Sequence, residues 1–273
     1  MLKDITLGQY FPMDSPIHRM DPRFKIIFTL VFIILVFFAN SVASYAAVAL
    51  FCTGVVYLSK IKMRLVLKSV KPLMIIIIIT AVINLFFTGG DHVIWQYKFL
   101  KITETGLLNA INMALRLIFL VVGSSLLTYT TSPLLLTDGI ESLLKPFSKI
   151  GLPAHELAMM MSIALRFIPT LILETEKIMM AQKSRGADFE SGNIINRAKA
   201  LIPVLIPLFI SSFRRADELA TAMECRCYRG GDNRTRMKEL KVSHVDFEAL
   251  FMMIVFTAVI ITLNIFNIKI MGY

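Results

Sequence analysis

The chain contains 273 residues, of which 56% are hydrophobic and only 18% charged, and its mean hydropathy is +0.69. This composition is too apolar for a soluble domain of that size and indicates an integral membrane protein. The formal net charge of +10 does not indicate nucleic-acid binding, because the basic residues flank hydrophobic runs, where they orient a chain in the bilayer.

Five apolar runs approach the roughly 20 residues that a helix needs to cross the hydrocarbon core. They are residues 25–39, 42–58, 72–87, 107–129 and 247–268. About 25 polar or mixed residues precede the first run, so we expect it to be a retained span rather than a cleavable signal peptide.

Charge asymmetry orients these spans. The loop at 60–71 carries Lys60, Lys62, Arg64, Lys68 and Lys71 without an acidic residue, which predicts a cytoplasmic location. In the loop at 89–106 the charges cancel, and Trp95 and Tyr97 are typical of an interfacial belt, so this loop should be external. The N-terminus and residues 131–246 are then predicted to be cytoplasmic.

Residues 131–246 are too long for a plain loop. Apolar residues at helical spacing predict an amphipathic helix around 136–147, and two longer helices are expected over 155–183 and 194–228. Both longer helices are apolar first and charged last. They are alternatively two further spans, but charged residues such as Arg166, Glu174 and Arg215 interrupt them, and a charge at mid-bilayer costs about 2.5–3.5 kcal/mol.

These observations predict an all-α membrane protein with five transmembrane helices. A cytosolic domain of three amphipathic helices is inserted between the fourth and fifth spans. The expected domains are a four-span membrane domain at 1–130, the cytosolic domain at 131–246, and the last transmembrane helix at 247–273.

The two longer helices end alike. Near their C-termini lie the triplets Ser184-Arg185-Gly186 and Cys225-Arg226-Cys227, and the two arginines are 41 positions apart. Gly186 is expected to stop the first of these helices. A basic residue at a helix C-terminus is favoured by the macrodipole by about 0.3–1 kcal/mol, so capping alone explains the pattern. In the functional interpretation, each arginine inserts into an acidic groove on a partner, where removing it costs about 2–5 kcal/mol.

Several longer motifs resemble the transmembrane T component of energy-coupling factor (ECF) vitamin transporters. The similar runs occur in order over essentially the whole chain, at residues 8–23, 130–133, 151–161, 166–171 and 181–188.

The resemblance implies a scaffold that joins two ABC-type ATPases to a membrane substrate-binding subunit, the S component, for uptake of vitamins or similar micronutrients. In that family two Ala-Arg-Gly motifs end the coupling helices and dock on the ATPases. The matching residues are Ser184, Arg185 and Gly186, and Cys225, Arg226 and Cys227. The second triplet lacks the family glycine, and cysteine disfavours a left-handed helix cap. No catalytic residue and no cofactor is implied.

Arg116 lies inside the fourth span, with Asn109 and Asn112 at helical spacing on the same face. An intramembrane charge is a candidate functional site. The alternative is an arginine that is paired or snorkels within the bundle.

Other classes of function fit less well. An intramembrane hydrolase or lipid-modifying enzyme needs convergent catalytic groups, but His18, His92, His155 and His244 are scattered. A secondary transporter would show an inverted repeat, which is lacking, and no Walker glycine-rich loop is present. The cysteines Cys52, Cys225 and Cys227 neither form a disulfide framework nor have the spacing of a metal site.

Overall fold

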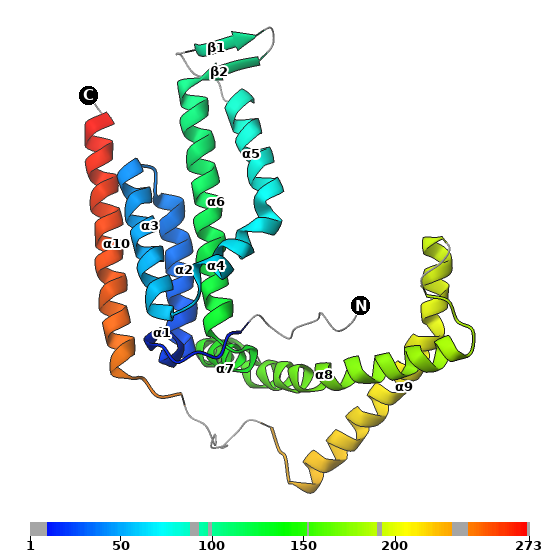
Figure 1. The fold of residues 1–273 in the computed structure, drawn as a ribbon. Helices are drawn as coiled ribbons and strands as arrows, with labels where there is room; N and C mark the ends of the chain where they lie inside the picture. Colours follow the sequence, from blue (N-terminus) through cyan, green and yellow to red (C-terminus); the bar gives the residue numbers. More distant parts are fainter. Residues whose placement is uncertain are drawn as a thin grey trace. The chain divides into compact units, whose positions relative to one another are not determined.

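The computed structural model describes residues 10–87, 93–97, 100–151, 153–189, 193–230 and 240–271. Helices account for nearly all of these residues (Figure 1). The long helices are α2 (Pro22–Phe38), α3 (Val42–Ser59), α5 (Met74–Phe87), α6 (Glu104–Thr130), α8 (Ala154–Ser184), α9 (Ile194–Cys225) and α10 (His244–Met271). The shorter elements are α1 (Pro16–Arg19), α4 (Met63–Val70), α7 (Pro133–Leu144), the 3-10 helices η2 (Lys71–Leu73) and η3 (Lys145–Ile150), and strands β1 (Val93–Tyr97) and β2 (Leu100–Thr103).

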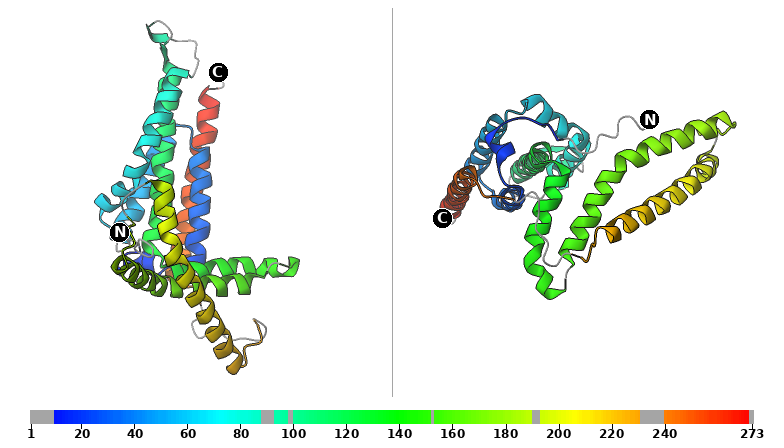
Figure 2. Two further views of the ribbon diagram at one scale, coloured as in Figure 1. Left: turned by 90° about the vertical axis from the view of Figure 1, so that its right-hand side faces the viewer. Right: turned by 90° about the horizontal axis from the view of Figure 1, so that it is seen from below.

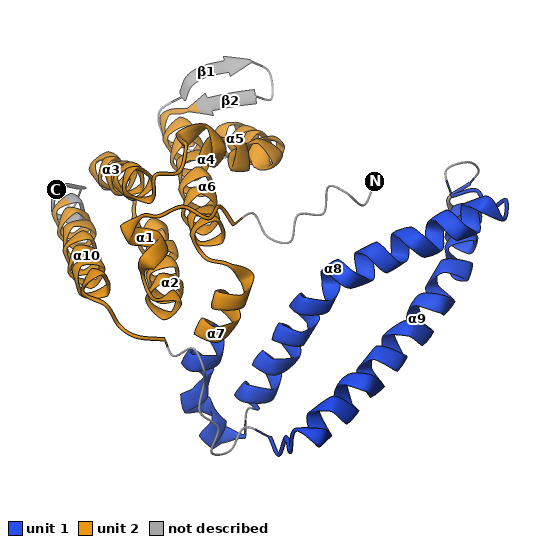
Figure 3. Ribbon diagram, turned by 60° about the horizontal axis from the view of Figure 1, so that its bottom comes forward, with its two compact units in different colours: residues 1–7, 140–239 blue, residues 8–139, 240–273 orange. Residues whose placement is uncertain are grey.

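Contacts divide the chain into two compact units (Figure 3). The bundle unit contains residues 8–139 and 240–273, and the hairpin unit contains residues 140–239. The predicted division into a four-span membrane domain at 1–130, a cytosolic domain at 131–246 and a last transmembrane helix at 247–273 stays a prediction.

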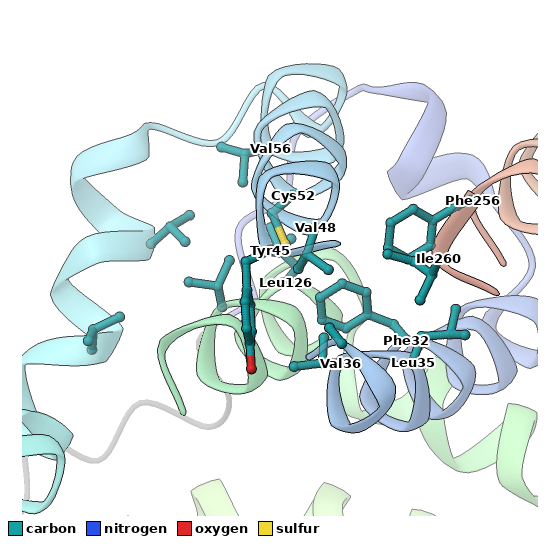
Figure 4. Close-up of a cluster of buried hydrophobic side chains, with 14 of the residues drawn as sticks. Phe32, Leu35, Val36, Tyr45, Val48, Cys52, Val56, Leu126, Phe256 and Ile260 are labelled. Atoms are coloured by element: carbon teal, nitrogen blue, oxygen red, sulfur yellow. The ribbon is translucent and has the colours of Figure 1, made fainter. Parts of the chain in front are cut away.

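The core of the bundle unit lies between α2, α3, α6 and α10 (Figure 4). Three phenylalanines from three helices stack there: the ring centroids of Phe51 and Phe256 are 4.1 Å apart, and those of Phe32 and Phe256 are 6.3 Å apart. A Cβ at Gly123 would lie 2.4 Å from the ring of Phe32. Only glycine therefore allows α6 to approach α2 this closely.

The predicted spans correspond to helices of the bundle unit, with one difference. The third predicted span starts at residue 72, whereas the helical segment already begins at Met63. The basic segment that was predicted as a loop therefore contains helix α4. Val66 and Val70, one turn apart, are buried, while Arg64 and Lys68 are exposed, so α4 is amphipathic.

A β-hairpin joins α5 to α6, in the region predicted as an external loop. Strands β1 and β2 pair antiparallel, with Tyr97 opposite Leu100 and Trp95 opposite Ile102. The β-branched and aromatic residues of 93–97 favour this conformation. The hairpin is an exception to the otherwise helical fold; residues 88–92, with His92, lie outside the described residues.

Among the described residues, six helical segments are long and apolar enough to cross a membrane: Val42–Ser59, Met63–Phe87, Glu104–Thr130, Ala154–Ser184, Ile195–Cys225 and His244–Phe266. With 17 residues, α2 is slightly shorter than these. The six include α8 and α9, which the sequence interpretation places outside the bilayer. The chain is thus a multi-pass membrane protein, and length and composition alone do not single out five spans.

A buried polar junction closes one end of the bundle unit. Oδ1 of Asp246, in the first turn of α10, accepts a hydrogen bond from the backbone N–H of Asp21 at 2.8 Å, and its Oδ2 accepts one from the N–H of Ser243 at 2.7 Å. Nζ of Lys25 donates to the carbonyl oxygens of Thr130, at 3.0 Å, and His18, at 3.2 Å. Asp246 is 1% exposed and Lys25 4%. The junction thereby holds together the starts of α2 and α10 and the end of α6.

A strap of residues 10–21, which includes α1, is fixed beside this junction. The N–H of Phe11 donates to the carbonyl of Tyr129 at 3.1 Å. His18 Nε2 lies 3.0 Å from the carbonyl of Phe11 and must carry the proton, because a carbonyl only accepts. Burial lowers the pKa of His18, so near pH 7 its Nδ1 is free to accept from Ser15 Oγ at 2.7 Å.

We expect Asp246→Ala to destabilise the protein strongly. It leaves the N–H groups of Asp21 and Ser243 without their acceptor and removes one of the two carboxylates near Lys25, a loss of about 2–5 kcal/mol. Thermal unfolding of the detergent-solubilised protein, followed by circular dichroism, measures the drop in Tm. The Tm of Asp246→Asn, which keeps one acceptor oxygen, should lie between those of the wild type and Asp246→Ala. Glu248→Ala, at an exposed neighbouring position, should have the wild-type Tm. An unchanged Tm for Asp246→Ala would contradict the proposed importance of the junction.

Candidate functional site

Helices α8 and α9 pair antiparallel in the hairpin unit (Figure 2, right). Near the end of α8, Gln182 Nε2 donates to the carbonyl of Pro203, in the first part of α9, at 3.3 Å. Near the start of α8, Met159 Sδ accepts from the hydroxyl of Tyr228, just beyond α9, at 3.0 Å. The end of each helix therefore lies beside the beginning of the other.

A polar contact fixes the middle of this pair. Glu174 of α8 accepts hydrogen bonds from the hydroxyl of Ser211 and from Nη2 of Arg215, the latter at 2.7 Å. The side chains of Arg215 and Glu174 are 34% and 21% exposed, so the ion pair is partly shielded from water. Glu174 and Arg215 are also 41 positions apart, the same offset as Arg185 and Arg226, so corresponding positions of the two similar segments form this pair.

The end of α8 is a Schellman motif centred on Gly186. The N–H of Gly186 donates to the carbonyl of Lys183, and the N–H of Ala187 donates to that of Gln182, both at 3.0 Å. Gly186 has a φ of +89°, which glycine adopts without steric cost. Arg185 is the C-cap residue.

The end of α9 has the same motif around Cys227. Its N–H donates to the carbonyl of Glu224 at 2.8 Å, and the N–H of Tyr228 donates to that of Met223 at 3.0 Å. Cys227 has a φ of +56°, a left-handed conformation that costs a non-glycine residue about 1–2 kcal/mol. Arg226 is the C-cap residue, as Arg185 is in α8. The missing family glycine therefore changes the strain of this end and not its geometry.

Both predicted triplets are exposed, from Ser184 to Gly186 and from Cys225 to Cys227. They lie at opposite ends of the α8–α9 pair. Tyr228, two residues after Arg226, contacts Met159, which precedes Arg185 by 26 positions. At 1.5 Å per helical residue, the two arginines are separated by about 40 Å.

The predicted polar group at Arg116, Asn109 and Asn112 is only partly brought together. Arg116 Nη2 donates to the carbonyl of Ala39 at 3.3 Å and to Oδ1 of Asn40 at 3.1 Å, in the corner between α2 and α3. No hydrogen bond joins it to Asn109 or Asn112 among the described residues. Sequence reasoning did not identify the partner Asn40, because the contact depends on how α6 packs against the corner between α2 and α3.

Little in the described residues supports the enzyme alternative. His155 Nδ1 lies 3.0 Å from Oε1 of Glu141, and its Nε2 is buried without a hydrogen-bond partner, so no serine or cysteine is activated by it there. Within the same residues, no three His, Cys, Asp or Glu side chains are grouped to hold a metal ion.

Comparison with known proteins gives the family. Residues 13–237 match the model of the CbiQ family, described as cobalt transport protein. The chain belongs to this family. Within it, the chain is similar to proteins named energy-coupling factor transporter transmembrane protein EcfT. It is 60% identical to that of Clostridium kluyveri over 250 residues, which is 91% of this chain and 93% of the relative.

Two other EcfT proteins are similar over comparable lengths. Identity to the one from Acidaminococcus fermentans is 59%, over 90% of this chain and 91% of the relative. Identity to the one from Bacillus subtilis is 44%, over 97% of this chain and 100% of the relative. The resemblance noted in the sequence is thus confirmed, and the chain is the transmembrane component of an energy-coupling factor transporter.

The two Schellman motifs respond oppositely to substitution. Cys227→Gly should relieve the left-handed strain by about 1 kcal/mol and so slow amide exchange in the last turn of α9 roughly fivefold. Gly186→Ala should accelerate exchange in the last turn of α8 by a similar factor. Hydrogen–deuterium exchange with mass spectrometry measures both. Cys225→Ser, in the same turn but without a positive φ, is the control and should change little. Faster exchange in Cys227→Gly would contradict the assignment of strain.

Proposed function

We propose that this chain is the coupling subunit of its transporter and that the ends of α8 and α9 each dock on one ABC-type ATPase. The observation that carries this proposal is the pairing of two like helix ends, each with an exposed C-cap arginine, at opposite ends of one antiparallel pair. Arg185 and Arg226 are separated by about 40 Å, a distance that favours contact with two partner subunits over insertion of both arginines into one groove.

The distribution of charge supports a location of α8 and α9 outside the bilayer. Because the pair is antiparallel, the charged half of each helix lies beside the apolar half of the other. A hydrocarbon slab about 20 residues thick that covers the apolar start of α8 would also cover Arg215, Asp217 and Glu218 of α9. Each such charge costs about 2.5–3.5 kcal/mol. We place this pair, and the N-terminus, in the cytoplasm.

An exposed apolar stripe on α9 fits contact with the membrane domain of the complex. Its residues recur every three or four positions and are between 43% and 71% exposed. They are Leu201, Ile202, Leu205, Ile206, Phe209, Ile210 and Phe213. Such a stripe needs an apolar partner, and we assign it to the S component.

In this mechanism the chain performs no bond chemistry. Closure of the two ATPases on ATP moves the grooves that hold Arg185 and Arg226. The Glu174–Arg215 contact keeps α8 and α9 moving as a pair, and the S component responds by releasing a vitamin or similar micronutrient inward.

Charge reversal at the helix ends tests the proposal. Arg185→Glu with Arg226→Glu should abolish association with the ATPases, because each removes a docked charge and places a carboxylate in an acidic groove. Native mass spectrometry of the co-expressed complex, together with substrate uptake, measures the result. Arg214→Glu, an exposed arginine inside α9, is the matched control and should retain both ATPases.

The single variants sharpen the test. Each should lose the ATPase at its own end and keep the other, which yields a complex with one ATPase subunit. A double variant that assembles and transports normally would refute the proposal.

A further inference from the structure

Arg116 lies deep in the membrane whichever way the chain is oriented. It is 12 positions from the start and 14 from the end of α6, which has 27 residues. The helix is about 40 Å long and the hydrocarbon core about 30 Å thick. If α6 spans that core, Arg116 lies at least roughly 8 Å inside it for every placement of the slab along the helix.

The guanidinium is held at this depth. It donates to the α2–α3 corner, to the carbonyl of Ala39 at 3.3 Å and to Asn40 Oδ1 at 3.1 Å. From the other side, Nδ2 of Asn264 in α10 donates to the carbonyl of Phe38. The corner between α2 and α3 therefore ends at the level of Arg116, while α5 and α6 continue past it. At Gly106, ten positions nearer the start of α6, an added Cβ would lie 3.1 Å from the carbonyl oxygen of Leu85 in α5.

The charge of Arg116 has no anionic partner within the described residues. Its two hydrogen-bond acceptors are neutral, and its Nε is buried without a partner. The last carbonyls of α2 supply at most a partial negative charge of about one half. A charge at such depth pairs with another charge or with backbone carbonyls. The carbonyl of Ala39 and the ring of Phe37, whose centroid lies 5.7 Å from Cζ of Arg116, therefore stabilise the guanidinium in part, and none of these groups carries a full negative charge.

The surroundings indicate where a counter-ion comes from. The corner is open at its outer face, where Asn40 is exposed and Phe37, Phe38 and Val42 are 54%, 62% and 78% exposed. Exposed phenylalanine and valine side chains are suited to acyl chains, and Asn40 and Arg116 to a headgroup. An anion that approaches among apolar side chains is the phosphate of a lipid.

We propose that the α2–α3 corner with Arg116 is a phospholipid site, in which the lipid phosphate pairs with the guanidinium while the acyl chains cover Phe37 and Phe38. The headgroup is drawn inward to the corner, so the leaflet is locally thinner there than beside α5 and α6. This site is independent of the ATPase contacts of α8 and α9.

Lipid binding to the delipidated full-length protein tests the proposal. Phosphatidylglycerol is added to protein in detergent, and native mass spectrometry counts the adducts. The wild type should hold one tightly bound lipid, and Arg116→Gln should bind it at least about tenfold more weakly, as expected for loss of one charge-assisted pair. Arg64→Gln, which removes an exposed basic residue of α4, is the matched control and should bind as wild type does.

Two further variants separate the effect of the positive charge from that of the hydrogen bonds between Arg116 and the α2–α3 corner. Asn40→Ala removes a hydrogen-bond acceptor of Arg116 but keeps the positive charge. Arg116→Lys keeps the positive charge but loses the planar guanidinium group. Both variants should retain the lipid. An excess of inorganic phosphate should not displace it, because the acyl chains contribute to binding. Equal affinity in Arg116→Gln, loss of the lipid in both Asn40→Ala and Arg116→Lys, or displacement by phosphate would overturn the proposal.

Discussion

The buried contact of Asp246 with the start of α2 is the constraint on which the arrangement of the chain depends. It joins residues 225 positions apart, and Lys25 adds the end of α6 through the carbonyl of Thr130. The bundle unit ends at residue 139, within α7, and resumes at residue 240, just before α10. The junction therefore fixes, within the bundle unit, the helices that precede and follow the long insertion.

The antiparallel pairing of α8 and α9 places the two copies of a repeated motif at opposite ends of the pair. Because α8 and α9 run antiparallel, a motif placed at the same point of each helix emerges at opposite ends of the pair. The Glu174–Arg215 contact lies between these ends and resists sliding of one helix along the other.

The sequence predicts what depends on local pattern and not what depends on long-range contact. Apolar runs predicted α3, α6 and α10 within a few residues, and the range expected for α8, 155–183, differs from the observed helix by one residue at each end. Helix α4 was not predicted because its few apolar residues, among them Val66 and Val70, are interspersed with basic ones. These valines stabilise the helix only when it packs against α6, which a local pattern does not show. The hydrogen-bond partners of Asp246 and Arg116 depend on how the helices pack, so they could not be predicted from local pattern. The left-handed cap at Cys227 forms because its backbone hydrogen bonds outweigh the preference of cysteine for other conformations.

The cysteines make the two like helix ends chemically different. Cys225 and Cys227 are free and exposed on either side of Arg226, Cys52 is buried in the bundle core, and the end of α8 carries no thiol. A maleimide applied to the folded protein therefore marks one end of the hairpin and leaves the other untouched. The chain thus already contains a chemical label that distinguishes the end of α9 from the end of α8 without any change of sequence.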